Sequence, residues 1–216
     1  MRQNISACTP PRVWRWDSAK GDQFGTGFVA ASPNSKIPAL VDHGTSPPTR
    51  IFESGAILVY LAEKFGALLP TESSARAECL SWLFWQMGST PYVGDGFAHF
   101  FHYADVKIEY PINRFAMEVK RQLDVLDRNL AEREYLCGDD YSISDTATFP
   151  WYGSLVLREV DDPVAQFLEA SSYSHVVRWA SEVQERIPVK RGQQVNMTTE
   201  PEEERVRERH DASDLD

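Results

Sequence analysis

Apolar and polar residues recur with a helical period through much of the second part of the chain. Between residues 108 and 133 an apolar side chain returns every three or four positions, and Glu, Lys, Arg and Asp fill the positions between. The members of this stripe are Ile108, Ile112, Phe115, Val119, Leu123, Leu126 and Leu130. A helix with this spacing has one apolar face, which it must bury against neighbours. The pattern predicts that residues 72 to about 187 are almost wholly helical.

Residues 1 to about 70 follow a different pattern. The short β-rich stretches RVWRW, KIPALVD and PTRIF are separated by prolines and precede one helical run. Such an alternation is typical of a small α/β unit. We therefore expect an α/β domain over residues 1–70, in which 1–20 are irregular, and an all-helical domain over residues 71–216.

The stretch YSISD, residues 141–145, predicts the start of a further helix. Ser142 and Asp145 have the spacing of a capping box, in which each side chain binds the other residue's backbone N–H. The helix should continue through TATFPWYGSLVL, and Pro150 predicts a kink or local break within it. From Pro188 onward the periodicity fades and acidic residues dominate, so we expect an extended tail from about residue 188.

Composition narrows the range of partners. The net charge of −10 and the absence of a basic stripe argue against nucleic acid, which leaves small molecules or proteins. The three cysteines, Cys8, Cys79 and Cys137, are odd in number and widely spaced, which favours a reducing compartment and a cytoplasmic protein. No stretch resembles a signal-peptide core or a membrane span, so no membrane partner is expected.

The stretch SPNSKIPAL, residues 32–40, places a proline at the start of a predicted strand. An X–Pro bond is the one peptide bond for which the cis form is accessible, and a proline at the first strand position costs no ladder hydrogen bond. A cis Ile37–Pro38 bond would turn the N–H and C=O of Ile37 outward, where they can bind another peptide. An ordinary trans proline at a strand start is the alternative, and spacing alone favours it.

The stretch RIFESGAILVYLAEKFG, residues 50–66, combines a short strand with a helix start. Ser54 would lie at the helix N-terminus, where free N–H groups and the macrodipole attract a carboxylate, and Glu53 beside it can pair with an ammonium group. This combination suits the head group of an α-amino acid. The alternative is an ordinary helix start with a capping serine and an acidic neighbour.

Three other features have plainer explanations. His99 and His102 have a spacing compatible with a metal, but histidines of aromatic-rich helices are more often buried, and we expect no metal. Cys137 is better explained as a small buried residue than as a nucleophile. A group of aromatic residues suits core and dimer packing better than an acceptor-substrate pocket. These are Trp82, Phe84, Trp85, Phe97, Phe100, Phe101 and Tyr103.

Taken together, the chain resembles the glutathione transferases, and within them the nu-class branch that includes glutathione-dependent disulfide-bond reductases. The resemblance covers residues 21–216 and rests on motifs that occur in the family's order. They are GDQF, SPNSKIPALVDH, FESGAILVYLAEKFG, WLFWQMG, HFFHYADVKIEYPINRF, YSISD and ERHDASD. The resemblance implies a thioredoxin-like N-terminal domain, a helical C-terminal domain, a homodimer, and glutathione as co-substrate without a metal.

The resemblance also implies the residues of a glutathione site. In the family, the proline matching Pro38 is cis and the residue matching Ile37 holds the cysteinyl backbone. Glu53 and Ser54 match residues that grip the γ-glutamyl end, and Gln86 matches a residue that reaches across the dimer interface. The complete implied set is Gln23, Lys36, Ile37, Pro38, Glu53, Ser54, Gln86 and Arg114.

The chain departs from the family at its start. The family's first strand and helix carry the Thr or Ser that stabilises the glutathione thiolate, and only 22 residues precede Gln23 here, too few for that unit. Thr9-Pro10 is a coincidental likeness, so no catalytic residue is named. We therefore expect a truncated thioredoxin-like domain, and three alternatives stay open. They are a glutathione-dependent disulfide reductase or conjugating enzyme, a non-catalytic binding or scaffold protein, and an incomplete product whose upstream reading frame supplies the unit. The substrate cannot be read from the sequence.

Overall fold

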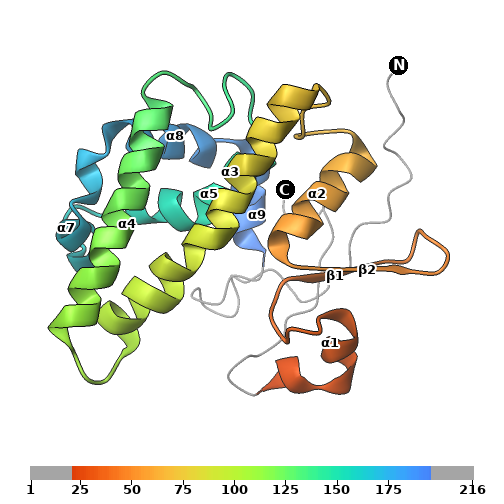
Figure 1. Cartoon of the computed structure of the whole chain (residues 1–216), viewed down its shortest axis with the longest axis horizontal. Helices are drawn as coiled ribbons and strands as arrows, with labels where there is room; N and C mark the ends of the chain where they lie inside the picture. The colour runs from red at the N-terminus through yellow and green to blue at the C-terminus, as the bar shows by residue number, and fades with distance from the viewer. Residues whose placement is uncertain (1–20, 196–216) are drawn as a thin grey trace.

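The computed structural model describes residues 21–195, so the expectations for residues 1–20, including the strand at RVWRW, and for residues 196–216 lie outside it. Figure 1 shows a small unit built on a two-stranded hairpin beside a larger body of helices. The elements of the small unit are η2 (Asp22–Phe24), α1 (Thr26–Ala31), β1 (Ala39–Asp42), β2 (Thr49–Phe52) and α2 (Ser54–Phe65). Those of the helical body are α3 (Ser73–Pro91), η3 (Tyr92–Tyr103), α4 (Glu109–Leu130), α5 (Ile143–Thr148), η4 (Phe149–Gly153), α6 (Ser154–Val156), α7 (Pro163–Leu168), η5 (Ala170–Ser172), α8 (Ser174–Gln184) and α9 (Ile187–Gln194).

The hairpin confirms the two strands predicted at KIPALVD and PTRIF. Strands β1 and β2 pair antiparallel, with Ala39 opposite Phe52 and Asp42 opposite Thr49. The turn between them is closed by the carboxylate of Asp42, which accepts a hydrogen bond from the N–H of Gly44 at 2.8 Å. Helices α1 and α2 lie on opposite sides of the hairpin (Figure 1), so one helix packs on each of its faces.

The small unit is joined to the helical body by hydrogen bonds and an apolar cluster. Helix α2 ends at Phe65 and is capped by Gly66, whose φ of 63° is a left-handed conformation that glycine adopts without strain. Just beyond it, the N–H of Ile143 donates to the carbonyl oxygen of Leu68 at 2.9 Å. The buried cluster beneath this bond comprises Ala62, Cys79, Leu83, Ile143 and Ala147. Helices α2, α3 and α5 are therefore packed together.

Helix α4 confirms the long amphipathic helix. Val119, Leu123 and Leu126 are fully buried, as the stripe predicts, whereas Ile108 precedes the helix and is 50% exposed. Helix α4 packs against η3, α7 and α8, and its buried face belongs to the main core. Within residues 21–195 no helix has the length and apolar character needed to cross a membrane.

The capping box at the start of α5 is also confirmed. The hydroxyl oxygen of Ser142 accepts from the N–H of Ser144 at 3.3 Å, and the carboxylate of Asp145 accepts from the N–H of Ser142 at 2.9 Å. At Phe149 the helix widens from α to π geometry and keeps that geometry to Gly153. This segment contains Pro150, so the predicted local break is present.

The expected extended tail is wrong over its first residues. Residues 187–194 form helix α9 where the sequence predicts an extended chain from about 188. The physical reason is that Pro188 lies in the first turn of the helix, where a missing N–H costs nothing and the fixed φ angle already suits a helix. Pro188 therefore starts a helix here and does not end one.

Candidate functional site

The first part of the candidate site is the loop before β1. The bond between Ile37 and Pro38 is cis, so of the two alternatives left by the sequence the structure has the cis form. The Ser32 hydroxyl donates to the carbonyl oxygen of Lys36 at 2.9 Å and holds the loop in place. The Ile37 side chain is 68% exposed, and its main chain forms no hydrogen bond with the rest of residues 21–195. This main chain is free to pair with a peptide-like ligand.

The second part is the junction between β2 and α2. Ser54 is the first residue of α2, and no described side chain caps this helix N-terminus. The N–H groups of its first turn, together with the positive end of the helix dipole, can therefore bind an anion. Glu53 precedes them with an exposed carboxylate and a φ of 71°, a region that non-glycine residues rarely adopt. An anion-binding helix end thus lies next to a carboxylate.

The hairpin register brings these two parts together. Because Ala39 lies opposite Phe52, the next residues outward on the two strands are Pro38 and Glu53, at the same end of the hairpin. The side-chain amide of Asn34 donates to the Glu53 carboxylate at 3.4 Å, which links the loop to the junction directly. The structure therefore groups the exposed main chain, the acid and the helix start, as the sequence interpretation requires.

Met87 supports the site from the helical body and was missed by the sequence analysis. The Ser54 hydroxyl donates to the sulfur of Met87 at 3.5 Å, and an added Cβ on Gly55 would lie only 3.0 Å from that sulfur. Ser54 and Met87 are 33 positions apart, so no local pattern could pair them. The one signal was Gly55 in the first turn of an otherwise regular helix, since glycine there often marks a close approach.

The other predicted site residues fall into two groups. Gln23, in η2, is half-buried and Lys36 is exposed, and both belong to the small unit. Arg114 is exposed on α4 in the helical body. Gln86 is 1% exposed and its amide donates to Thr90, one turn later on α3. A contact of Gln86 with a ligand across an interface would need another side-chain conformation, so its role stays a prediction.

The histidines of η3 do not form a metal centre with their neighbours. His99 and His102 are both exposed, so the expectation of buried histidines is wrong. Each ring packs edge-on against the next aromatic residue, Phe100 and Tyr103 respectively. Among residues 21–195 no group of three or more His, Cys, Asp or Glu side chains could hold a metal ion. Two histidines at a suitable spacing on one helix are not sufficient for a metal site without a third ligand nearby.

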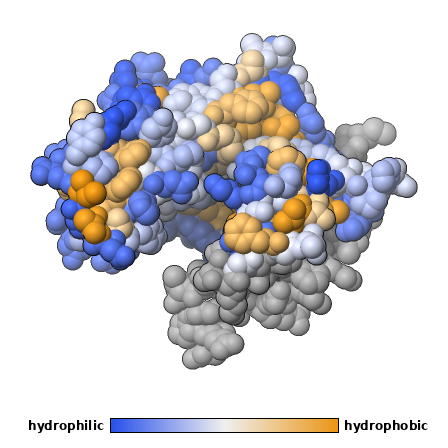
Figure 2. Space-filling view, turned by 60° about the horizontal axis from the view of Figure 1, so that its bottom comes forward, coloured by the Kyte–Doolittle hydropathy of each residue, from blue (hydrophilic) through white to orange (hydrophobic). Residues whose placement is uncertain are grey.

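The aromatic group divides between core and surface. Trp85 contacts both Trp82 and Tyr152, with ring centroids 5.4 and 5.5 Å apart, which is the packing role expected. Phe84 and Tyr103 are 67% and 70% exposed. Figure 2 shows separate hydrophobic patches on one face of the molecule, divided by hydrophilic surface.

Two open hollows lie in the helical body, away from the hairpin end. One of about 200 Å³ is lined by Pro91, Tyr92, Asp95, Gly96 and Phe115. The other, of about 440 Å³, is lined by Phe101, Lys107, Glu109, Ile112, Asn113 and Phe167. Of the aromatic group, only Phe101 lines either of these hollows, and the choice between packing and an acceptor-substrate pocket stays a prediction.

A small hairpin unit packed on a helical body is consistent with the glutathione-transferase class of protein. Comparison with known families and proteins supports this class. Residues 89–186 match the family "Glutathione S-transferase, C-terminal domain". The chain is 57% identical over 204 residues to the disulfide-bond oxidoreductase YghU of Escherichia coli K12, an alignment that covers 94% of the chain and 70% of that protein. The chain belongs to the glutathione S-transferase family.

Solved structures agree with this assignment. The glutathione transferase YghU from Streptococcus pneumoniae, crystallised with glutathione, is 55% identical to the chain. Its TM-score is 0.79, and the match covers 83% of the chain and 69% of the Streptococcus protein. A glutathione transferase from Pseudomonas putida, with one glutathione disulfide bound per subunit, is 37% identical to the chain. Its TM-score is 0.76, and the match covers 84% of the chain and 79% of the Pseudomonas protein. The predicted fold class, a thioredoxin-like unit followed by a helical domain, is thereby confirmed.

Proposed function

We propose that the chain binds glutathione at the hairpin end and uses it to reduce disulfides or to conjugate an electrophile. The observation that carries this proposal is the juxtaposition of Ile37 and Pro38 with Glu53 and Ser54, set by the strand register. The relatives support it, because one is named a disulfide-bond oxidoreductase and two others were crystallised with glutathione or its disulfide.

Each part of the site suits one part of the tripeptide. The N–H groups at the start of α2 and the Ser54 hydroxyl would bind the α-carboxylate of the γ-glutamyl group. Glu53 would pair with its α-ammonium, and the main chain of Ile37 would hold the cysteinyl backbone. Lys36, beside it, would neutralise the glycyl carboxylate. The charges on the ligand thus meet opposite charges at both of its ends.

In the proposed reaction the bound glutathione supplies the thiol. Its thiolate attacks one sulfur of the substrate disulfide, that S–S bond breaks, and the leaving thiolate takes up a proton. A second glutathione then attacks the mixed disulfide, which releases the reduced substrate and leaves glutathione disulfide. No catalytic side chain is assigned among residues 21–195, and the chain would act by holding and orienting the tripeptide.

We infer further that the protein is a cytoplasmic homodimer. Support for the dimer comes from exposed apolar residues such as Phe84 on α3 and Phe65 on α2, which are 67% and 50% exposed in the single chain. In a dimer, Gln86 and Arg114 would be the contacts supplied to glutathione by the helical body. Multi-angle light scattering of the purified protein tests the assembly, and a monomeric mass would contradict it.

Calorimetric titration with glutathione and with glutathione disulfide tests the site. We expect Ser54→Ala to weaken binding about tenfold or more, because a hydrogen bond to a charged group is worth roughly 1.5–3 kcal/mol. Ser174→Ala is the matched control, since Ser174 is likewise the first residue of a helix, α8, and should bind as the wild type does. A wild-type protein that is folded and binds neither form would refute the proposal.

Activity separates the proposal from its alternative. Glutathione-dependent reduction of a small disulfide, lost in Ser54→Ala and kept in Ser174→Ala, would exclude a non-catalytic role. Binding without turnover of any disulfide or electrophile would instead favour the binding or scaffold protein. This second function stays open because the sheet within the described residues has two strands. The strand and helix that carry the thiolate-stabilising Thr or Ser in the family are not among these residues.

A further inference from the structure

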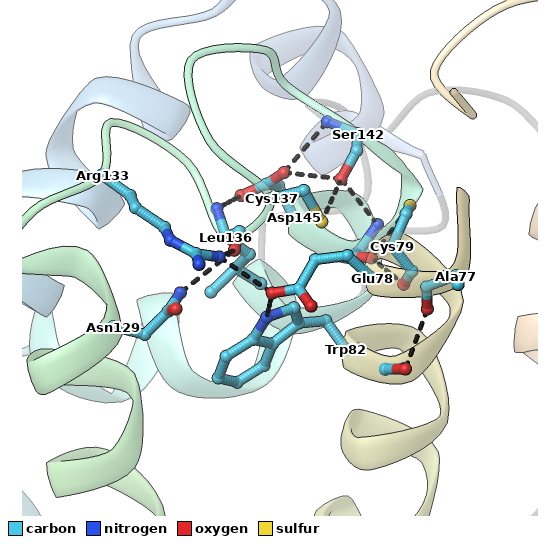
Figure 3. A network of polar contacts seen from close by, with 12 residues as sticks. Ala77, Glu78, Cys79, Trp82, Asn129, Arg133, Leu136, Cys137, Ser142 and Asp145 are labelled. Carbon is cyan, nitrogen blue, oxygen red and sulfur yellow. Dashed lines mark hydrogen bonds and ion pairs between the residues drawn. The ribbon is translucent and has the colours of Figure 1, made fainter. Parts of the chain in front are cut away.

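Two cysteine side chains lie in one apolar cluster where α3 packs against the turn before α5, away from the hairpin end. Cys79 on α3 is fully buried, and Cys137 in the turn is half-buried. Both belong to the apolar cluster that joins α2, α3 and α5. Figure 3 shows Cys79 and Cys137 gathered with Ser142 and Asp145 at the start of α5. The glutathione mechanism uses neither thiol.

The surroundings of the two sulfurs are polar and fixed. The sulfur of Cys79 lies 3.2 Å from the hydroxyl of Ser144, which also donates to the carbonyl oxygen of Cys79 at 2.6 Å. The sulfur of Cys137 lies 3.6 Å from the hydroxyl of Ser142. The turn that carries Cys137 is closed by the pair of hydrogen bonds between Tyr135 and Gly138. Two serine hydroxyls at the start of α5 therefore each contact one of the two thiols.

The two thiols also affect each other's ionisation. A hydrogen bond with Cys137 is the largest cause that lowers the pKa of Cys79, to about 6, and the same contact raises the pKa of Cys137. Hydroxyl groups of Ser142 and Ser144 act in the same direction on Cys79, and burial opposes them. Because the two thiols are coupled, the loss of a proton belongs to the pair, and the remaining proton can pass between the two sulfurs.

We propose that Cys79 and Cys137 form a redox pair that glutathione disulfide converts into an intramolecular disulfide. Cys137, the half-buried member of the pair, first passes its proton to the thiolate of Cys79, and its sulfur then attacks one sulfur of glutathione disulfide. The S–S bond of glutathione disulfide breaks, and the first glutathione thiolate takes up a proton from water. The sulfur of Cys79 then attacks the Cys137 sulfur of this mixed disulfide, and the second glutathione thiolate leaves and takes up the proton of Cys79. The two cysteine sulfurs lose two electrons in total, and glutathione disulfide gains them.

This order of attack follows from burial. Cys79 is shielded from a molecule as large as glutathione disulfide, whereas Cys137 presents part of its surface. Cys137 is therefore the entry point and Cys79 the resolving thiol. The proposal does not depend on the glutathione site, because glutathione disulfide acts here as an oxidant from solution.

The experiment uses the full chain with Cys8→Ser, so that Cys79 and Cys137 are its only cysteines. After exposure to glutathione disulfide, intact mass should fall by two hydrogens. Trypsin should then release a linked pair of peptides, one beginning at Ala77 and the other at Glu134. An unchanged mass, in a sample whose thiols react once denatured, would overturn the proposal. So would a stable glutathione adduct on Cys137.

Two variants test the order of attack. Cys79→Ala should trap a single glutathione on Cys137, because the resolving thiol is gone. Cys137→Ala should remain unmodified while folded, and a glutathione adduct on Cys79 would contradict the assigned entry point. Circular dichroism establishes that each variant folds, and Cys79→Ser is the replacement if the alanine variant does not. Ser54→Ala should still form the disulfide, which separates this proposal from that of the glutathione site.

Discussion

The hydroxyl of Ser54 donates a hydrogen bond to the sulfur of Met87, so a residue of the helical body supports the first residue of α2. The same Met87 side chain fills the space beside Gly55, where an added Cβ would lie 3.0 Å from its sulfur and 3.1 Å from its Cγ. The position of Ser54 therefore depends on the packing between α2 and α3. Substitutions on either helix should alter glutathione binding without touching the ligand.

Gly55→Ala tests this dependence. The new methyl group must displace Met87, so we expect a loss of roughly 1–3 kcal/mol in the free energy of unfolding and a severalfold weaker affinity for glutathione. Chemical denaturation and calorimetry measure the two effects. Gly88→Ala is the control, because Gly88 is an exposed helical residue with no atom within 4 Å of an added Cβ. The Gly88→Ala variant should gain up to about 1 kcal/mol in the free energy of unfolding and bind glutathione as the wild type does. Unaltered binding in Gly55→Ala would show that Met87 does not position Ser54.

Glu53 should show a conflict between stability and binding. Its φ of 71° is unfavourable for any residue with a Cβ, and glycine adopts that angle freely. Glu53→Gly should therefore be more stable than Glu53→Ala by about 1 kcal/mol, since both lack the carboxylate and only the alanine keeps the strained backbone. Both variants should lose glutathione affinity to a similar extent. Equal stability of the two variants in urea denaturation would mean that the backbone at this position is not strained.

Elements with a local signal were predictable from the sequence. Spacing alone identified α4, and the pair Ser142 and Asp145 identified the start of α5, because both signals lie within a few turns of the chain. Pro188 was misinterpreted, since proline is compatible with the first turn of a helix as well as with an extended chain. The domain boundary near residue 70 stays a prediction, although α2 ends at Phe65 and α3 begins at Ser73.

The candidate site was only partly predictable. Residue chemistry alone left Ile37–Pro38 and Ser54 open to ordinary structural explanations, and the resemblance to a family, not the spacing, favoured a shared site. Contacts that depend on tertiary packing could not be paired from the sequence, although Gly55 marked one position of close approach. Met87 beside Ser54 is one case, and Cys79 beside Ser144, 65 positions apart, is another. Such pairs are set by how α3 lies against α2 and α5, which no local pattern specifies.

Arg178 should be important for the end of α4. Its guanidinium group donates to the carbonyl oxygens of Leu130 at 3.0 Å and of Arg133 at 2.7 Å, where the helix leaves carbonyl groups without partners. We expect Arg178→Ala to lower the free energy of unfolding by roughly 1.5–3 kcal/mol. Arg128→Ala removes an exposed ion pair with Asp124 and a long, exposed hydrogen bond of 3.3 Å to the carbonyl oxygen of the same residue, and it should change the free energy of unfolding by less than about 1 kcal/mol. Similar losses in both variants, measured by urea denaturation, would argue against a specific role for Arg178.

Asp145 should make stability depend on pH in an unusual direction for a carboxyl group. Its side chain is fully buried, and the burial raises its pKa, although hydrogen bonds from the N–H groups of Leu136 and Ser142 and the indole of Trp179 oppose the shift. The folded protein therefore holds this proton more tightly than the unfolded chain does. The stability that this proton contributes is fully present below the ordinary pKa of an aspartate, and it is lost as pH rises through the raised value.

Comparison with Asp145→Asn isolates this contribution, because the variant cannot ionise at this position. The amide nitrogen would face backbone donors, so we expect the variant to be less stable than the wild type by roughly 1–3 kcal/mol at acidic pH. The difference should shrink as the pH approaches neutrality, since the wild type must then bury a charge that the variant lacks. Urea denaturation at several pH values measures it, with the exposed Asp161→Asn as a control for the loss of a carboxylate. A difference that grows with pH would mean that the hydrogen bonds outweigh burial and that the pKa of Asp145 is lowered.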